Sequence, residues 1–195
     1  MQAITSNGSL IRKVYFPREV LPLANVLAQC THFLLALLVL GPYLVVLRGW
    51  GVLSHLPAVV LGIVLITIFA AGAAMLLAAI NVTFRDLQEL IVVLFLVWFY
   101  LTPIIYPYEM ATAAAGTSVV GAVFLTVVYL NPMTWFVRLF RESLYGIGFL
   151  GNDQSLPPRW PTPDVLLGCT AVALLTFALG YLLFHRFAVT FAKEV

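Results

Sequence analysis

Acidic side chains are the first residues to consider for chemistry, and the chain has only eight of them in 195 residues. Asp86 and Glu89, three positions apart, are the one closely spaced carboxylate pair, a pattern that acid–base catalysis or metal binding can use. The surrounding stretch NVTFRDLQEL also fits the start of a helix, where acidic side chains interact favourably with the helix dipole. We therefore interpret Asn81, Arg85 and Asp86 as a cytoplasmic turn rather than as a catalytic site.

The other residue types that usually carry chemistry are isolated. The three histidines lie far apart in the sequence, and the two cysteines fall in apolar runs without a CxxC motif, so neither type has the spacing of a metal site. The chain also lacks the GxxxxGK[ST] motif that holds nucleotide phosphates. We expect no catalytic residue, no metal and no cofactor on this chain.

The segment LIRKVYFPREVLPL, residues 10–23, mixes charged and aromatic side chains in an unusual way. Its candidate contact residues are Arg12, Lys13, Tyr15, Phe16, Pro17, Arg18 and Glu19. The basic residues favour the cytoplasmic face of a membrane, and the prolines restrict the backbone, which reduces the entropy lost on binding. Two interpretations stay open: the segment docks on a partner protein, or it lies on anionic lipid with its rings at the interface.

The overall composition indicates a membrane protein. Hydrophobic residues make up 63% of the chain and charged residues 9%, whereas soluble domains are about half apolar and about a quarter charged. A net charge of +2 is too small to indicate a nucleic-acid partner.

Charge-free runs long enough to cross the hydrocarbon, which takes about 20 residues, occur four times. They predict spans at residues 25–47, 57–80, 90–107 and 165–184. Pro103 and Pro107 shorten the third span because proline lacks a backbone donor, while Gly62 and Gly72 favour close helix packing in the second. We predict one transmembrane domain, residues 1–195, with residues 1–24 as a cytoplasmic segment.

Residues 111–146 are less regular. The apolar run at 118–130 is too short for a crossing, and the helix after it can be capped by Asn131 and started by Pro132. That second helix is amphipathic, and its charged residues are Arg138, Arg141 and Glu142. The predicted fold is therefore an all-α integral membrane protein with about four transmembrane helices and two short re-entrant or interfacial helices on the outer side.

Basic residues near the span ends set the expected orientation. Six of the ten lysines and arginines fall on the side that holds both termini, and four fall on the other side. Because cytoplasmic loops are enriched in Lys and Arg, we expect both termini to be cytoplasmic.

The third predicted span carries an aromatic face. Phe95, Phe99, Thr102 and Tyr106 recur at the spacing of one helix face, and Trp98 adds a further ring. Such a face suits the apolar C–H edges of sugar rings, so these residues are candidates for a substrate pathway. The alternative is that they are ordinary lipid-facing or interfacial aromatic residues.

Four segments, in this order, resemble the membrane subunit of ABC-type polysaccharide exporters, the type-2 ABC permease family that exports O-antigen, teichoic acid and related glycans. They are NGSLIRKVYFPREVLPLANVL, NVTFRDLQELIVVLFLVWFYLTPIIYP, LNPMTWFVRLFRESLYG and FHRFAVTFAKEV. The resemblance extends from residue 7 to the C-terminus. Members of that family usually have an interfacial helix and two further spans ahead of this loop, so we expect this chain to be short at its N-terminus.

The resemblance implies a transporter of the bacterial cytoplasmic membrane driven by a separate ATPase, which holds ATP and Mg²⁺. It implies that a second permease chain in a homodimer completes the pathway and that residues 12–19 couple the ATPase to the helices. It also implies that the short helices bearing Asn131 and Arg138 form an outer gate. The alternatives are a type-2 ABC permease for a drug or lipid, a membrane-embedded glycosyl or phospholipid transferase, and an inactive truncated scaffold.

Overall fold

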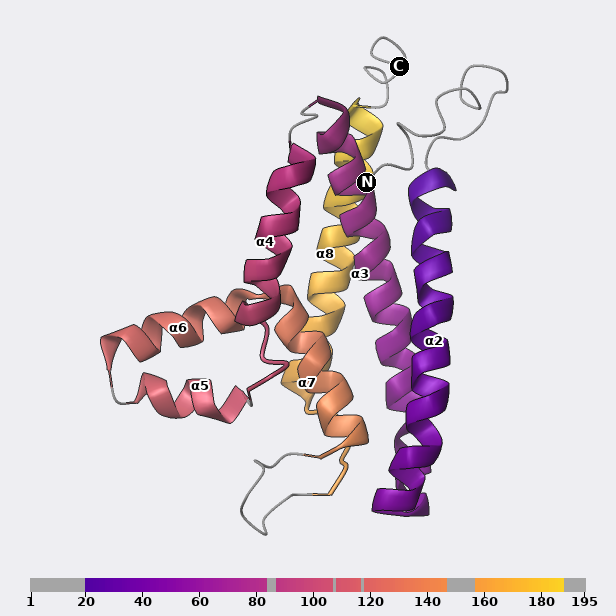
Figure 1. The fold of residues 1–195 in the computed structure, drawn as a ribbon, viewed down its shortest axis with the longest axis vertical. Coiled ribbons are helices and arrows are strands. Elements are labelled where there is room, and N and C mark those ends of the chain that lie inside the picture. The colour runs from indigo at the N-terminus through magenta and orange to yellow at the C-terminus, as the bar shows by residue number, and fades with distance from the viewer. Residues whose placement is uncertain (1–19, 84–86, 107, 117, 147–156, 188–195) are drawn as a thin grey trace. The chain divides into compact units, whose positions relative to one another are not determined.

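The computed structural model describes residues 20–83, 87–106, 108–116, 118–146 and 157–187, and these residues form helices and no strand (Figure 1). The long helices are α2 (Val20–Arg48), α3 (Leu56–Thr83), α4 (Leu87–Leu101) and α8 (Pro163–Phe187). The short ones are the 3₁₀ helix η1 (Trp50–His55) and the α-helices α5 (Tyr108–Ala115), α6 (Val119–Leu130) and α7 (Pro132–Leu144). The predicted all-α fold is confirmed.

Three helices in the described residues have the length and apolar composition to cross a membrane: Val20–Arg48, Trp50–Asn81 and Pro163–Phe187. The pair α6 and α7, bent by 81° at its junction, is either a broken fourth span or a re-entrant loop. The chain is thus an all-α integral membrane protein. Between α2 and α3 the chain turns at Gly49, whose φ of 80° is a left-handed value that glycine adopts without strain.

The helix of the third predicted span is shorter than its sequence suggests. α4 has 15 residues and ends at Leu101, which gives it a length of about 22 Å against a hydrocarbon thickness of about 30 Å. Proline at 103 has no N–H to continue the helix, and the amide of Ile104 donates instead to the carbonyl of Thr102 at 2.7 Å. The expectation that residues 102–106 continue the helix is wrong.

Residues 108–144 form three short helices rather than the two expected. The additional helix, α5, runs antiparallel to α6 in a hairpin (Figure 1). The two helices approach closely because residue 121 is glycine, where a Cβ atom would collide with the carbonyl of Ala114. Ser118 caps α6 by accepting a hydrogen bond from the Gly121 amide at 3.0 Å, so a cap and a small residue together define this hairpin.

The chain divides into two compact units, each considered separately. The first comprises the described parts of residues 1–38, 65–92 and 171–195. In it α3 and α8 pack backbone to backbone, because a Cβ at Gly72 would collide with the backbone of Phe177 and a Cβ at Gly180 with that of Gly72. Next to this contact Met75 and Phe184 belong to a buried core cluster. The second unit, residues 39–64 and 93–170, contains the short helices.

Gly72→Ala is expected to lower the free energy of unfolding by about 1–3 kcal/mol, the usual range for overpacking a tight contact. Gly41→Ala is the matched control, because a Cβ at Gly41 meets no atom within 4 Å and alanine is the better helix former. Thermal unfolding in detergent checks both variants. Equal melting temperatures for the two would contradict the close α3–α8 packing.

Candidate functional site

Asn131 lies at the junction of α6 and α7, where the chain turns by 81°. It ends α6 and caps α7, since its side-chain oxygen accepts a hydrogen bond from the Met133 amide at 3.0 Å. Pro132 occupies the first turn of α7, where a backbone N–H has no partner within the helix, so the missing N–H of proline removes no hydrogen bond. The predicted cap and helix start are confirmed, and the sharp turn positions the rest of the site.

The Asn131 side chain also joins α7 to the end of α4. Its Oδ1 accepts a hydrogen bond from the Trp98 indole N–H at 2.7 Å, and its Nδ2 donates to the Thr102 hydroxyl at 2.9 Å. The Thr102 hydroxyl in turn donates to the carbonyl of Trp98 at 2.8 Å. Asn131 and Thr102 are 8% and 2% exposed, so the three side chains form a buried polar cluster, which we call the Asn131 cluster.

Arg141 makes a second connection between the same two elements. Its guanidinium donates to the carbonyl of Pro103 at 3.0 Å and to that of Ile104 at 3.4 Å. These carbonyls belong to the irregular chain that follows α4, where no helix supplies their partners. Arg141 therefore satisfies backbone acceptors that the early end of α4 leaves open.

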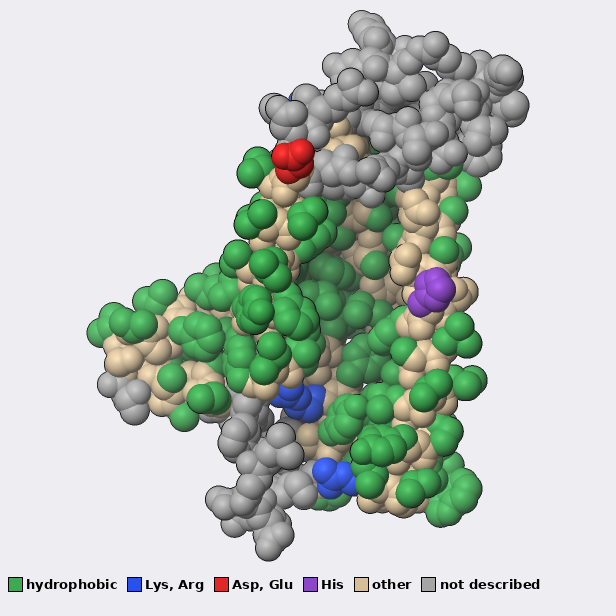
Figure 2. All heavy atoms as spheres, viewed as in Figure 1, with side chains coloured by type: hydrophobic (Ala, Val, Ile, Leu, Met, Phe, Trp, Pro, Cys, Tyr) green, Lys and Arg blue, Asp and Glu red, His purple; other side chains and the backbone are tan. Residues whose placement is uncertain are grey.

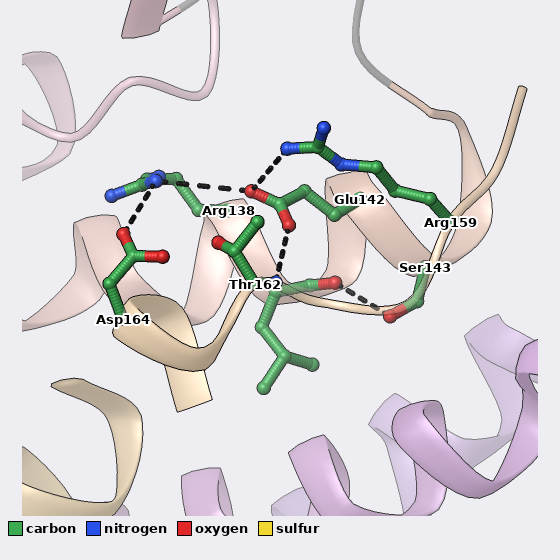
Figure 3. Close-up of polar contacts among 7 residues, drawn as sticks. Arg138, Glu142, Ser143, Arg159, Thr162 and Asp164 are labelled. Carbon is green, nitrogen blue, oxygen red and sulfur yellow. Dashed lines mark hydrogen bonds and ion pairs between the residues drawn. The ribbon is translucent and has the colours of Figure 1, made fainter. Parts of the chain in front are cut away.

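A network of charges holds α7 to the start of α8 (Figure 3). The Glu142 carboxylate is 3.9 Å from Arg138 and 3.7 Å from Arg159, and it accepts a hydrogen bond from the Thr162 amide at 3.0 Å. Arg138 also pairs with Asp164 at 3.2 Å. The Glu142 side chain is 4% exposed, and a buried carboxylate needs such partners to remain charged.

Arg138 connects this charge network to aromatic rings. Its guanidinium carbon lies 4.6 Å from the centroid of the Tyr108 ring and 5.5 Å from that of Trp135, within the range of cation–π attraction. Tyr129 packs edge-on against Trp135 with ring centroids 4.9 Å apart. The first residues of α5 and α7 and the end of α6 thus meet around one arginine.

Comparison with known proteins identifies the family. Residues 3–145 match the family described as ABC-2 type transporter, which is well over half of the chain. The chain belongs to the ABC-2 type transporter family. The matched region contains α2 to α7, and with them the Asn131 cluster and Arg141.

Individual relatives of this ABC-2 type transporter chain carry a narrower name. The chain is 31% identical, over 99% of its length, to the O-antigen export system permease protein RfbA of Myxococcus xanthus, of which it covers 67%. It is 31% and 29% identical, over 70% of its length, to two proteins of the same name from Klebsiella pneumoniae. The chain spans about half of the length of those two relatives, 49% in each case.

In this ABC-2 type transporter chain, the predicted pathway residues divide into three groups. Trp98 and Thr102 belong to the Asn131 cluster. The structure therefore joins residues predicted for the substrate pathway to Asn131, which was predicted for the outer gate. Phe95 and Phe99 remain 48% and 45% exposed on a helix whose visible surface is largely hydrophobic (Figure 2). Tyr106 lies beyond the end of α4, and its ring packs 5.7 Å from that of Phe124. The prediction that Tyr106 shares one helix face with Phe99 is wrong, because α4 ends at Leu101.

The predicted cytoplasmic residues fall mostly outside the described part of the chain. Arg85 and Asp86 lie there, and so does the whole candidate coupling set of residues 12–19. Asn81 is described, but α3 continues through Thr83, so Asn81 lies in the last helical turn and not in the turn that follows. Its side chain is 4% exposed, and its Oδ1 has no hydrogen-bond partner among the residues that the structure describes.

Sequence reasoning missed Arg159, Thr162 and Asp164. All three lie in the proline-rich stretch SLPPRWPTPD, residues 155–164, to which no role was assigned from the sequence. A usable signal was present, because a buried carboxylate such as Glu142 needs cationic partners and Arg159 is the only basic residue between Arg141 and the last helix.

Asn131→Ala is expected to cost about 1–3 kcal/mol of stability, because it leaves the buried hydroxyl of Thr102 and the indole of Trp98 without their partner. The cost should be smaller in a Trp98→Phe background, with a coupling energy of about 0.5–3 kcal/mol, since neighbours in one network are not additive. Thermal unfolding of the four proteins of this double-mutant cycle measures the coupling.

Thr126→Ala serves as the control for this cycle. Thr126 is exposed on α6 and bonds to the carbonyl of Ala122 within its own helix, so its loss should leave the melting temperature nearly unchanged. Additive effects of Asn131→Ala and Trp98→Phe would mean that the Asn131 cluster does not act as a unit.

Proposed function

We propose that this chain is the transmembrane subunit of an exporter that moves polysaccharide or lipid-linked glycan out of the cytoplasm. The observation that carries the proposal is the similarity to O-antigen export permeases, which in the Myxococcus xanthus relative covers 99% of this chain. The membership in the ABC-2 type transporter family assigns the broader class, and the relatives suggest the cargo.

The surface of α4 supports a glycan as cargo. Phe95 and Phe99 lie one helical turn apart and are about half exposed, and the ring of Phe95 lies 5.9 Å from that of Trp98. Aromatic faces attract the C–H edges of sugar rings through dispersion and the ring quadrupole. Because these contacts are weak and do not depend on one orientation of hydroxyl groups, many successive sugar units can pass over them.

The Asn131 cluster and Arg141 give α4 a fixed outer end in this proposal. Four polar contacts tie the last turn of α4 and the chain after it to α7. A displacement of α7 would therefore move the aromatic face of α4 as well. We assign Asn131, Pro132, Arg138, Arg141 and Glu142 to an outer gate that opens as the cargo passes.

Energy for export would come from a separate ATPase that binds ATP and Mg²⁺, and a second copy of the permease would complete the pathway. The candidate contact with the ATPase is the charged and aromatic set at residues 12–19. The proposed setting is the bacterial cytoplasmic membrane with both termini in the cytoplasm, because most basic residues near span ends fall on that side.

Phe95→Leu combined with Phe99→Leu tests the aromatic pathway. Leucine keeps the apolar bulk but removes the ring, so glycan export should fall about three- to tenfold, as expected from the loss of ring contacts worth about 0.5–1.5 kcal/mol. The measurement is surface glycan in cells that contain the permease together with its ATPase, alongside the amount of permease in the membrane.

The matched control is Val93→Leu combined with Val97→Leu. These residues have the same spacing on the opposite side of α4 and are 60% and 51% exposed, so export should be retained. Equal export by both double variants would show that the rings only face lipid. Accumulation of a drug or lipid instead of glycan after loss of the permease would reassign the cargo.

Phe16→Ala combined with Arg18→Ala tests the coupling segment. Loss of one aromatic and one arginine contact at a protein interface typically weakens association by at least 1–2 kcal/mol, or roughly tenfold in Kd. Co-purification of the ATPase with the permease measures this, and Lys193→Ala, a basic residue near the other terminus, is the control. Unchanged ATPase recovery and unchanged export would exclude residues 12–19 as the coupling contact.

A further inference from the structure

The four tryptophans of the chain differ in what surrounds them. Trp98 donates its indole N–H to Asn131, and Trp135 is only 8% exposed. By contrast, Trp50, the first residue of η1, is 77% exposed, and Trp160, in the chain between α7 and α8, is 56% exposed. The indole N–H groups of these two donate to no residue that the structure describes. The chain thus presents two large apolar rings, each with a free donor, to its surroundings.

The two exposed tryptophans lie at the same end of the second unit. The ring of His55, the last residue of η1, lies 6.3 Å from the ring of Trp160. η1 is a 3₁₀ helix of six residues, so Trp50 is about 10 Å from His55 along its axis at about 2 Å per residue. Val52 of η1 is 5% exposed, and η1 packs against α7. Trp50 is therefore carried by an element that is itself held in place.

The chain around Trp160 is bonded to α7 on both sides of this residue. The amide of Arg159 donates to the carbonyl of Glu142 at 2.9 Å, and the amide of Thr162 donates to the Glu142 carboxylate at 3.0 Å. Figure 3 shows Arg159 and Thr162 beside Glu142. Both exposed tryptophans therefore belong to segments that pack on α7 or bond to it, although the two segments are far apart in the sequence.

Charged residues locate this end of the unit at the membrane surface. α2 carries no Lys, Arg, Asp or Glu before its last residue, Arg48, and α8 carries none between Asp164 in its first turn and Arg186. Both helices are candidate membrane spans, and charged side chains are costly in hydrocarbon, so the helices leave the hydrocarbon near Arg48 and Asp164. Trp50 lies two positions after Arg48, and Trp160 lies four positions before Asp164. Both rings are therefore at the boundary between hydrocarbon and headgroups.

The chemistry of indole suits this boundary. Its ring is apolar while its N–H needs an acceptor, and tryptophan is enriched where membranes meet water for this reason. The ester and phosphate oxygens of phospholipids supply acceptors at this depth, and the acyl chains begin directly beneath them. Leu53 in η1 and Leu56 at the start of α3 are 41% and 47% exposed, so apolar surface continues beside Trp50. Lipid covers such a surface, whereas water does not stabilise it.

We propose that Trp50 and Trp160 form an interfacial anchor that binds phospholipids of the leaflet next to the end of α2. The indole N–H groups donate hydrogen bonds to ester or phosphate oxygens, and the rings lie against the first part of the acyl chains. Because the segments that carry both rings are attached to α7, the anchor also fixes the charge network of Arg138 and Glu142 at the membrane surface. This inference does not depend on the identity of the exported cargo.

The test uses tryptophan fluorescence of the full chain in phosphatidylcholine vesicles whose lipids carry bromine, which quenches indoles on contact. The bromine is placed either close to the ester groups or at the ends of the acyl chains, and quenching should be stronger from the position close to the ester groups. Trp50→Phe combined with Trp160→Phe should remove most of this shallow quenching. Trp135→Phe is the matched control, because it makes the same change at a ring that the protein covers, and it should leave the shallow quenching unchanged.

Other surroundings of the two rings give different results, and each would overturn the proposal. Rings that face water would be quenched by iodide in the buffer and by neither brominated lipid, and rings deep in the membrane would be quenched more from the chain ends. Rings covered by a second copy of the chain would show more lipid quenching as the protein is diluted in the vesicles. Rings that hold glycan would lose shallow quenching when soluble oligosaccharide from the cell surface is added. Shallow quenching that is independent of dilution and of oligosaccharide, and that only the double variant removes, supports the anchor.

Discussion

Hydrogen bonding of buried polar groups in an apolar medium is the constraint on which the second unit depends. Within the membrane, water does not satisfy a backbone or side-chain group that a helix end leaves open. Asn131 meets this constraint at a sharp bend by capping one helix and accepting from the indole of Trp98. Arg141 meets it after the end of α4 by donating hydrogen bonds to the carbonyls of Pro103 and Ile104. The bend and the early end of α4 persist because side chains from α7 replace the missing helical partners.

The same constraint links the fold to the proposed transport. An exporter needs elements that can move together without exposing polar groups to lipid, and a network of side-chain contacts provides such a connection. Glu142 binds two arginines and the Thr162 amide, which joins α7 to the start of α8. α7 is therefore bonded both to the chain at the end of α4 and to the start of α8, as the proposed gate requires.

Small residues have opposite effects at two places on α3. Gly72 lets α8 approach to backbone contact, which gains dispersion energy along both helices. Ala70, Ala74 and Ala78 leave a space beside α2 instead, since no helix of the described chain comes close enough to fill it. Whether a small residue tightens a contact or opens a pocket depends on the distance of the neighbouring helix, which the residue itself does not set.

The sequence by itself determined the membrane class, the all-α fold, the cap at Asn131 and the amphipathic α7. Each of these follows from local composition, periodicity or cap chemistry. The quoted segments also indicated the family. Tertiary structure alone decided that Trp98 and Thr102 bond to Asn131, that Tyr106 leaves the aromatic face, and that α5 forms a separate helix. These facts depend on which distant groups satisfy one another where a helix ends, and spacing along the chain does not specify such pairings.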